Sequence, residues 1–214
     1  MFKAFKAVLV GGAAAATVLV ATPSAWATPA PISYHSTSCP NSLTYNEDDG
    51  CVVYLQQMLN TLGFGLSVDG QFGANTLSAV KWTQTKAHLQ DSSVGVDGQV
   101  GPVTKGWIDK FYAQSSRQPG PSNACSIVLN PSPTSGAGGA SATIAQINNS
   151  ATCTGWLERY SNGSWSQVSG QHTIGGPGQW VTTYVYADTS TELARACVHY
   201  VGSGVSGTTC TIGF

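Results

Sequence analysis

A nine-residue pattern that occurs twice constrains the fold of this chain more than any other feature. Residues 68–76 read V-D-G-Q-F-G-A-N-T, and residues 96–104, 28 positions later, read V-D-G-Q-V-G-P-V-T. Asp-Gly is a turn pair, because the Asp side chain can bond its own downstream backbone and Gly accepts a positive φ. Each copy is therefore expected to form a tight loop that leads into a helix.

Helical spacing and helix-start residues predict three helices around these loops. The first helix is marked by apolar residues at intervals of three and four, namely Val52, Leu55, Leu59 and Leu62. It is expected to end at Gly63. Pro102 suits a first helical turn, because its missing N–H would have no partner there. We expect the second helix over about residues 74–87 and the third over about residues 102–112.

The repeat and the helix before it resemble a known family. The positions that carry the resemblance are Leu55, Gln56, Leu59, Asn60, Leu62, Gly63, Val68, Asp69, Gly70, Phe72, Gly73, Thr76, Ala79, Val80, Gln84, Asp97, Gly98, Val100, Gly101, Pro102 and Thr104. Over about residues 51–111 the chain resembles the peptidoglycan-binding domain of the three-helix type, which accompanies many wall hydrolases. The resemblance implies a compact, non-catalytic domain that holds its owner on peptidoglycan.

Six residues of this domain are candidates for binding the ligand: Asp69, Thr76, Trp82, Gln84, Asp97 and Thr104. The structural alternative is that the aspartates and glycines of each repeat are turn and cap residues. Gln84 would then bond the loop backbone and satisfy buried groups. The chain departs from the family pattern at Thr83, where a bulky apolar residue is usual, and at Trp82, which is bulkier than usual. Both departures indicate a reshaped groove near the second helix.

The first 27 residues have the features of an export signal. Lys3 and Lys6 supply a positive end, residues 7–20 are apolar, and residues 25–27 (A-W-A) form a small-x-small cleavage site. The apolar stretch is shorter than the ~20 residues that a spanning helix needs, which disfavours the alternative of a membrane anchor. We expect a secreted, cell-wall-associated protein that starts at Thr28 and has no membrane contact after cleavage.

Composition narrows the classes of partner. Charged residues make up 9% of the chain, and the formal net charge is −1, or −3 without Lys3 and Lys6. The chain therefore lacks the basic surface that phosphate backbones attract, and nucleic acid is not expected as a partner. A polymer of sugars and peptides remains compatible with this charge.

Six cysteines follow the signal, an even number that favours disulfides in an exported protein. Cys39 and Cys51 flank a polar segment and are expected to pair. In the chain-entropy model, a disulfide that closes a loop of this size stabilises the fold by roughly 3 kcal/mol. The other four allow three connectivities. The favoured one joins Cys197 to Cys210 across a hairpin and Cys125 to Cys153; the rival joins Cys153 to Cys197 and Cys125 to Cys210.

Beyond the helices, the composition changes to that of a linker and then of a β domain. Residues 115–140 are rich in Pro, Gly and Ser and predict a linker, with a possible strand at Cys125–Leu129. Residues 141–214 are expected to form a small antiparallel sandwich or barrel, in which Asn162-Gly163 makes a two-residue hairpin turn. Strands are expected at 142–148, 152–160, 164–169, 180–187, 193–201 and 208–212.

Aromatic residues of the β domain allow two interpretations. Both faces of residues 180–186 carry apolar bulk, which predicts a central strand. Trp156, Trp165 and Trp180 could stack on sugar rings, but few other residues could build a core, which favours core packing. This half resembles no named family, so a protein or a glycan partner stays open.

No catalytic signature is found in the sequence. We therefore expect that the protein is not an enzyme and binds no cofactor. Metal is not expected either, since the histidines lack local metal spacing and Glu47, Asp48 and Asp49 have no further ligands nearby. Cys197 and His199 share a strand face, but a cysteine in a disulfide cannot be a nucleophile. Two alternatives to a binding protein remain. One is a wall hydrolase that uses two of the three acidic residues of the β domain, Glu158 and Asp188, and not Glu192. The other is an interaction or inhibitor protein that is retained at the wall.

Overall fold

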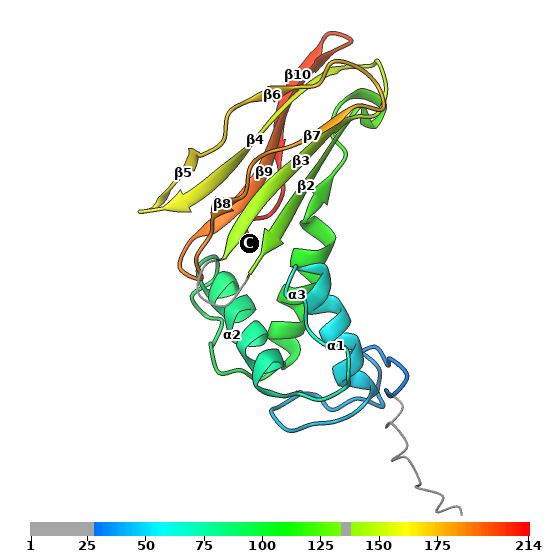
Figure 1. Ribbon diagram of the computed structural model, residues 1–214, viewed down its shortest axis with the longest axis vertical. Coiled ribbons are helices and arrows are strands. Elements are labelled where there is room, and N and C mark those ends of the chain that lie inside the picture. The colour runs from blue at the N-terminus through cyan, green and yellow to red at the C-terminus, as the bar shows by residue number, and fades with distance from the viewer. Residues whose placement is uncertain (1–27, 134–137) are drawn as a thin grey trace, which may run out of the picture.

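The computed structural model describes residues 28–133 and 138–214, so the expected signal peptide lies outside the described residues. A helical domain forms one end of an elongated molecule and an antiparallel β domain forms the other (Figure 1). This is the expected fold class. Within the described residues, no helix is long and apolar enough to cross a bilayer.

Three helices make up the first domain: α1 (Gly50–Thr61), α2 (Ala74–His88) and α3 (Pro102–Gln114). Asp49 caps α1, because its carboxylate accepts hydrogen bonds of 2.8 and 2.9 Å from the backbone N–H groups of Cys51 and Val52. α2 and α3 begin directly after the glycine of each repeat, as expected. The apolar stripe predicted for the first helix is buried in the core, with Val52, Leu55, Leu59 and Leu62 almost fully covered.

The segment before α1 is fastened to both repeat loops. The isolated β-bridges Leu43–Val100 and Asp48–Gln71 join it to the two loops. The disulfide Cys39–Cys51 joins it to α1. Lys105 of α3 is buried, and its Nζ donates to the carbonyl oxygens of Tyr34 and Pro40 at 2.9 and 3.0 Å. The N-terminal tail is therefore part of the helical domain.

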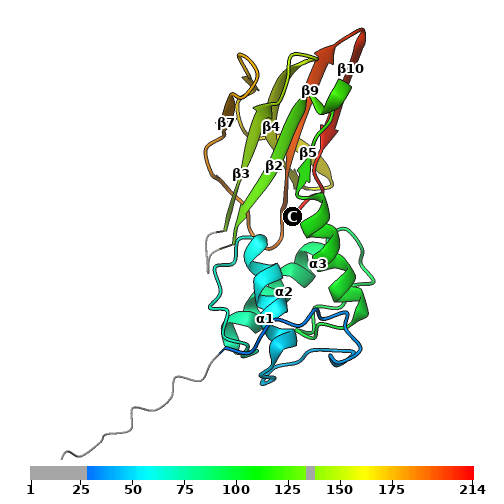
Figure 2. The same ribbon diagram turned by 90° about the vertical axis from the view of Figure 1, so that its right-hand side faces the viewer.

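Two antiparallel sheets form the β domain. One sheet has the order β1 (Ser116–Arg117), β2 (Cys125–Ser132), β3 (Gly139–Gln146) and β7 (Trp180–Thr182), and β8 (Tyr186–Ala187) also pairs with β3. The other has the order β10 (Val205–Cys210), β9 (Leu193–Gly202), β4 (Thr152–Ser161) and β5 (Ser164–Gln167), and β6 (His172–Thr173) also pairs with β4. The sheets pack face to face (Figure 2).

Aliphatic side chains, not tryptophans, fill the space between the sheets. Ile127 and Ile144 of one sheet and Leu157 and Val198 of the other are almost fully buried. Trp156 and Trp165 are only half-buried, and Trp180 is 69% exposed. The expectation of a tryptophan core is therefore wrong. On β4 the buried positions are Cys153, Gly155 and Leu157, so Trp156 lies on the opposite, outward face of the strand.

All three disulfides have the favoured connectivity. Besides Cys39–Cys51, Cys125 on β2 pairs with Cys153 on β4 and joins the two sheets. Cys197 pairs with Cys210 across the β9–β10 hairpin, where the strand register sets them opposite each other. The hairpin turn at Asn162-Gly163 is also as expected, with φ of 52° and 82°.

The described part of the range expected to be a linker is largely ordered. It contains β1, the short 3-10 helix η1 (Pro121–Asn123), all of β2 and the beginning of β3. β2 pairs with β3 over its whole length, including Pro131 opposite Ala140. The prolines and glycines of this range are residues that strands usually exclude, and they hid the strands in the sequence.

The chain end lies at the junction of the two domains and helps to join them (Figures 1 and 2). Phe214 is buried and makes edge-on ring contacts with Phe64 and Phe111, at centroid distances of 6.2 and 4.9 Å. Gln90 donates a 2.9 Å hydrogen bond to the carbonyl oxygen of Gly213. The last residues of the β domain are therefore packed into the core of the helical domain.

An ion pair is buried in the same junction. Lys86 of α2 contacts Asp188 at 2.7 Å, and their side chains are 0% and 4% exposed. Lys86 also donates to the carbonyl oxygen of Glu192. Burial raises the pKa of Asp188 to about 6, and burial lowers the pKa of Lys86, which the Asp188 carboxylate opposes. Two segments 102 residues apart in sequence are thus joined by charge as well as by apolar contact.

Candidate functional site

The first copy of the repeat closes around a buried glutamine of α1. Gln56 Nε2 donates to Asp69 Oδ1 at 2.7 Å, to the carbonyl oxygen of Gln71 at 3.0 Å and to Thr76 Oγ1 at 3.3 Å. Gln56 Oε1 accepts from the backbone N–H groups of Asp69 and Gly70 at 3.0 and 2.9 Å. One side chain therefore holds residues 69–71 of the loop between α1 and α2, together with Thr76 in the first turn of α2.

The second copy reproduces this network 28 residues later. Gln84 Nε2 donates to Asp97 Oδ1 and to the carbonyl oxygen of Gln99, both at 2.9 Å, and to Thr104 Oγ1 at 3.1 Å. Gln84 Oε1 accepts from the backbone N–H of Gly98 at 2.8 Å. The domain thus contains two equivalent helix–loop–helix units that share α2.

Five of the six candidate residues take part in these networks. Asp69 and Thr76 belong to the first, and Gln84, Asp97 and Thr104 belong to the second. The polar groups of Gln84 that could meet a ligand are engaged with the loop. The hydrogen bonds of these five residues within the domain therefore agree with the interpretation that the aspartates are turn and cap residues and that Gln84 bonds the loop backbone.

Hydrogen bonds keep both loop aspartates ionised. Partial burial acts to raise the pKa of Asp69, but hydrogen bonds from Gln56 and from the backbone of Gln71 outweigh it and hold the pKa below its usual value. For Asp97 the backbone N–H of Gln99 makes the largest contribution, and its pKa is also lowered. The repeat therefore presents two anchored carboxylates near the starts of α2 and α3.

A groove runs beside α2. One hollow of about 180 Å³ lies at the start of α2 and is lined by residues that include Asp69, Thr76, Leu66, Ser67 and Asn75. The adjoining hollow of about 420 Å³ shares Leu66, Ser67 and Asn75 and is completed by Phe64, Gly65, Ser78, Ala79, Trp82 and Pro133. We call these two hollows together the α2 groove. From Asn75 to Trp82 it follows α2 for roughly 10 Å, at 1.5 Å per residue.

Trp82 lies where the α2 groove meets the β domain. Its ring lies 5.4 Å from Lys86 Nζ, and its outer edge faces Gly138, the residue before β3, where an added Cβ would lie 2.9 Å from the ring. The indole N–H is buried and has no hydrogen-bond acceptor among the described residues. The sixth candidate residue thus forms a wall of the larger hollow, together with Pro133 of the other domain.

The second repeat has its own hollow. It has a volume of about 340 Å³ and is lined at equivalent positions by Val94, Gly95, Asp97, Gln99, Gly101, Pro102, Val103 and Thr104. Position 110 of α3, which corresponds to Trp82, is an exposed lysine that stacks on Trp107 at 3.9 Å. Lys110 does not line this hollow, whereas Trp82 forms a wall of the larger hollow at the first repeat.

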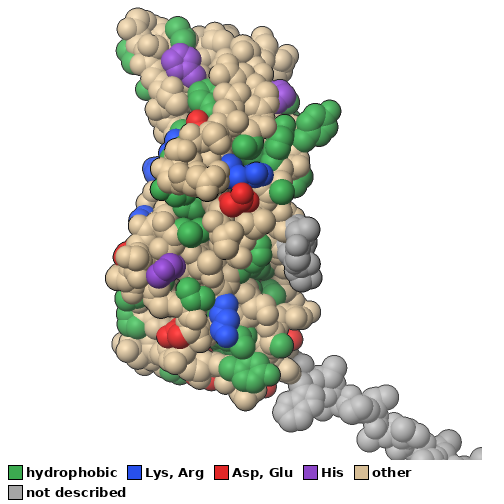
Figure 3. Space-filling view, turned by 90° about the vertical axis from the view of Figure 1, so that its left-hand side faces the viewer, with side chains coloured by type: hydrophobic (Ala, Val, Ile, Leu, Met, Phe, Trp, Pro, Cys, Tyr) green, Lys and Arg blue, Asp and Glu red, His purple; other side chains and the backbone are tan. Residues whose placement is uncertain are grey.

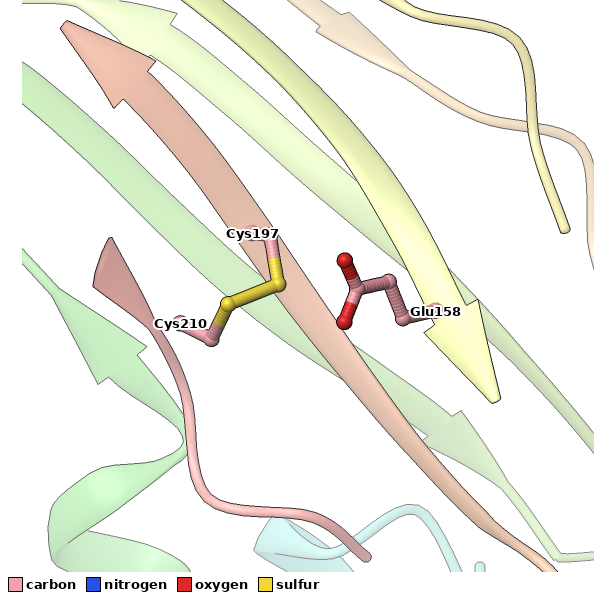
Figure 4. A group of neighbouring side chains, drawn as sticks. All are labelled: Glu158, Cys197 and Cys210. Carbon is pink, nitrogen blue, oxygen red and sulfur yellow. A yellow bond between two sulfur atoms is a disulfide. The ribbon is translucent and has the colours of Figure 1, made fainter. Parts of the chain in front are cut away.

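Glu158, Cys197 and Cys210 approach one another in the β domain, as Figure 4 shows. This is the one group in the described chain with the spacing of metal ligands. Both sulfurs are committed to the disulfide, so neither is a thiolate that could bind a cation. The Glu158 carboxylate accepts from Arg195 at 2.7 Å and from the indole N–H of Trp156 at 2.8 Å. The group is a packed salt bridge beside a disulfide.

The acidic residues considered for glycoside cleavage have cationic partners. Glu158 pairs with Arg195, Asp188 with Lys86, and Glu192 with Arg159 at 3.8 Å. Glu158 and Glu192 lie at the surface of the sandwich, whereas Asp188 is buried in the junction. These residues are held by structural contacts.

Comparison with known proteins places the helical domain. A family model described as "Putative peptidoglycan binding domain" matches residues 49–108. The match begins at the residue that caps α1 and ends within α3, so it covers both Gln-centred networks. Residues 49–108 are a peptidoglycan-binding domain of the three-helix type. The α2 groove lies along the second helix of this domain.

Other comparisons add little to the β domain. No curated protein matches the chain. A solution structure of CsgH from R. palustris is 12% identical, covers 41% of this chain and 90% of that chain, and has a TM-score of 0.30. A score this low does not establish a shared fold.

Proposed function

We propose that this chain is a secreted, non-catalytic protein that binds peptidoglycan through its three-helix domain and thereby attaches its β domain to the cell wall. The match of residues 49–108 to the peptidoglycan-binding family carries this proposal. The disulfides agree with it, since such bonds persist in proteins outside the cytosol.

The α2 groove is the proposed site for the wall polymer. It is open, it runs along a helix, and its walls combine the aromatic Trp82 and Phe64 with the polar Ser67, Asn75 and Ser78. Aromatic faces pack against apolar faces of a ligand, while hydroxyl and amide groups bond its polar edges. A groove with this lining fits a chain of N-acetylated sugars with attached peptides.

A non-catalytic role agrees with the state of the carboxylates. Cleavage of a glycosidic bond needs one carboxyl group as acid and a second about 5–9.5 Å away as base or nucleophile. Glu158 forms a salt bridge with Arg195 at 2.7 Å, and Asp188 faces Lys86 inside the domain junction. Neither carboxylate lines the α2 groove.

Binding and cleavage can be tested in one assay. Residues 28–214 are mixed with purified insoluble peptidoglycan and centrifuged, and the supernatant is analysed for soluble muropeptides. The proposal predicts that the protein pellets with the polymer and that no muropeptides are released above a protein-free control. Release of fragments that is abolished by Glu158→Gln would support the wall hydrolase instead. Absence of pelleting would refute attachment to the wall.

A further inference from the structure

Two aromatic side chains project from one edge of the β domain into solvent. Trp180 on β7 is 69% exposed, and Tyr184, which follows β7, is 84% exposed. At about 3.3 Å per residue they lie roughly 10–13 Å apart along the strand direction. Exposure of this degree is unusual for rings that contribute so much to burial elsewhere in proteins.

A β-bulge presents these rings. Thr182 pairs with Thr143 and Tyr186 pairs with Ala140, so three residues on the edge strand lie opposite two on β3. Thr183 anchors the bulge: its side chain is buried, its N–H donates to the Ala142 carbonyl oxygen at 2.9 Å, and its Oγ1 accepts from the Ala142 N–H at 3.0 Å. Bulges at sheet edges redirect side chains, and this one directs Tyr184 outward.

The sheet face beside the rings is polar and has no charge. Its outward-facing residues on β2, β3 and β7 are Ser126, Val128, Asn130, Thr143, Ala145, Trp180 and Thr182. Asn130 Nδ2 donates to Thr143 Oγ1 at 2.9 Å, and Thr143 Oγ1 lies 2.8 Å from Thr182 Oγ1. On the face of the molecule that Figure 3 shows, the charged side chains form small separate groups. We call this surface, together with Tyr184, the β7 face.

We propose that the β7 face binds the glycan strand of peptidoglycan as a second site. The C–H groups on the face of a sugar ring stack on the π-face of Trp180 and Tyr184, and the sugar hydroxyl and acetamide groups bond the Asn130, Thr143 and Thr182 side chains. A neutral face suits the uncharged sugar backbone better than the charged stem peptides. The choice of this polymer rests on the proposed function of the helical domain.

The β7 face is continuous with the α2 groove. Along β2 the outward-facing residues continue from Asn130 to Ser132, and the next residue, Pro133, lines the α2 groove beside Trp82. The buried Lys86–Asp188 pair and Phe214 hold the two domains together at this point. One extended polymer can therefore contact both surfaces without any change in domain arrangement.

An added peptide strand fits the β7 face poorly. Strand addition needs a regular row of free N–H and C=O groups along a sheet edge. Here the edge strand is broken into β7, of three residues, and β8, of two residues, by the bulge. Natural sheets use bulges in this way to prevent pairing at their edges.

The test measures affinity for a neutral N-acetylated glycan, the N-acetylglucosamine hexamer, by isothermal titration calorimetry on residues 28–214. The variant Trp180→Ala/Tyr184→Ala should raise Kd by about tenfold or more, because both stacking contacts are lost. The matched control is Tyr45→Ala/Tyr112→Ala, which removes two rings of the helical domain that are 50% and 51% exposed. That control should leave Kd for the hexamer unchanged.

A parallel arm keeps this inference separate from the proposed function. Ser78→Arg, which fills the α2 groove, is measured for pelleting with whole peptidoglycan and for hexamer affinity. Loss of pelleting in Ser78→Arg, together with loss of hexamer affinity in the Trp180/Tyr184 variant, would support both proposals. Hexamer affinity that the Trp180/Tyr184 variant retains, or no hexamer binding by the unmodified protein, would overturn the second site alone. A change of sedimentation coefficient in that variant without a change in hexamer affinity would assign the face to a second copy of the chain and also overturn it.

Discussion

At the scale of single residues, two glutamines organise the helical domain. Gln56 and Gln84 each satisfy a loop aspartate, a loop carbonyl and a helix threonine. The sequence predicted an inward role for Gln84, and the structure has it. The equivalent role of Gln56 was not predicted, although a search at the repeat spacing of 28 residues would have found it.

Replacing either glutamine should destabilise the protein by a similar amount. We expect Gln56→Leu and Gln84→Leu each to lower the free energy of unfolding by about 1–3 kcal/mol, because loop N–H and C=O groups lose their partner. Urea denaturation followed by circular dichroism measures this. Gln99→Ala removes an exposed side chain of the same loop and should change the free energy by less than about 0.5 kcal/mol. Equal effects of Gln84→Leu and Gln99→Ala would contradict the role given to the network.

At the scale of elements, turns and helices were predictable and the ends of the sheet were not. Asp-Gly, Asn-Gly and Pro102 each have a local backbone reason for their positions, and the helices and hairpin follow them. For β2, the sequence predicted only a possible strand at Cys125–Leu129 within a linker. Pro131 hid the rest of the strand. Residues 180–186 were expected to form a central strand, but β7 is an edge strand, since one residue beyond regular pairing turns Tyr184 and Val185 to solvent.

The hairpin between β4 and β5 depends on a positive φ at Gly163. Its φ is 82°, a conformation that costs an L-residue roughly 1–2 kcal/mol, and no atom lies within 4 Å of the position that a Cβ would occupy. Gly163→Ala should therefore lower the free energy of unfolding by about 1 kcal/mol through backbone strain alone. Gly170→Ala is the control, since Gly170 has the same open surroundings without a positive φ. Thermal denaturation of both variants compares them directly; an equal loss in both would exclude strain as the cause.

At the scale of the whole molecule, the junction between the domains is the feature that sequence reasoning missed. Composition predicted a flexible linker, whereas Lys86, Asp188 and Phe214 meet in a buried contact. No local pattern signals this contact, because its residues are far apart in the chain and each looks ordinary in its own segment. The site is affected in turn, since Pro133 of one domain and Trp82 of the other both line the α2 groove.

The buried ion pair should show strong coupling in a double-mutant cycle. Lys86→Met leaves Asp188 without its cation, and Asp188→Leu leaves a buried ammonium, so each should cost about 3–5 kcal/mol. The double variant should be more stable than either single variant, because it leaves no unpaired charge. Chemical denaturation of the four proteins gives the coupling energy. Additive single effects would mean that the two side chains do not act as a pair.

Asp188 should also give the protein a recognisable pH dependence. Burial raises its pKa from 3.8 to about 6, so the folded state binds the proton more tightly than the unfolded chain does. The contribution of this group to the free energy of unfolding is therefore larger at pH 4 than at pH 7, and it is lost as pH rises from about 4 to 6. The difference is on the order of 1–3 kcal/mol, at about 1.4 kcal/mol per pKa unit. Asp188→Asn should lack this slope when both proteins are unfolded at several pH values; an identical slope would assign it to other groups.

The central claim, that the α2 groove holds the wall polymer, is tested most directly by blocking it at one exposed position. Ser78 lines the groove, and Gly106 is its repeat equivalent on α3, exposed and with nothing within 4 Å of an added Cβ. The measurement is the apparent Kd of Ser78→Arg and Gly106→Arg for insoluble peptidoglycan, by co-sedimentation at matched ionic strength. The account predicts that Ser78→Arg weakens binding about tenfold or more, while Gly106→Arg binds like the unmodified protein. Unchanged binding by Ser78→Arg, or an equal loss in both variants, would contradict it.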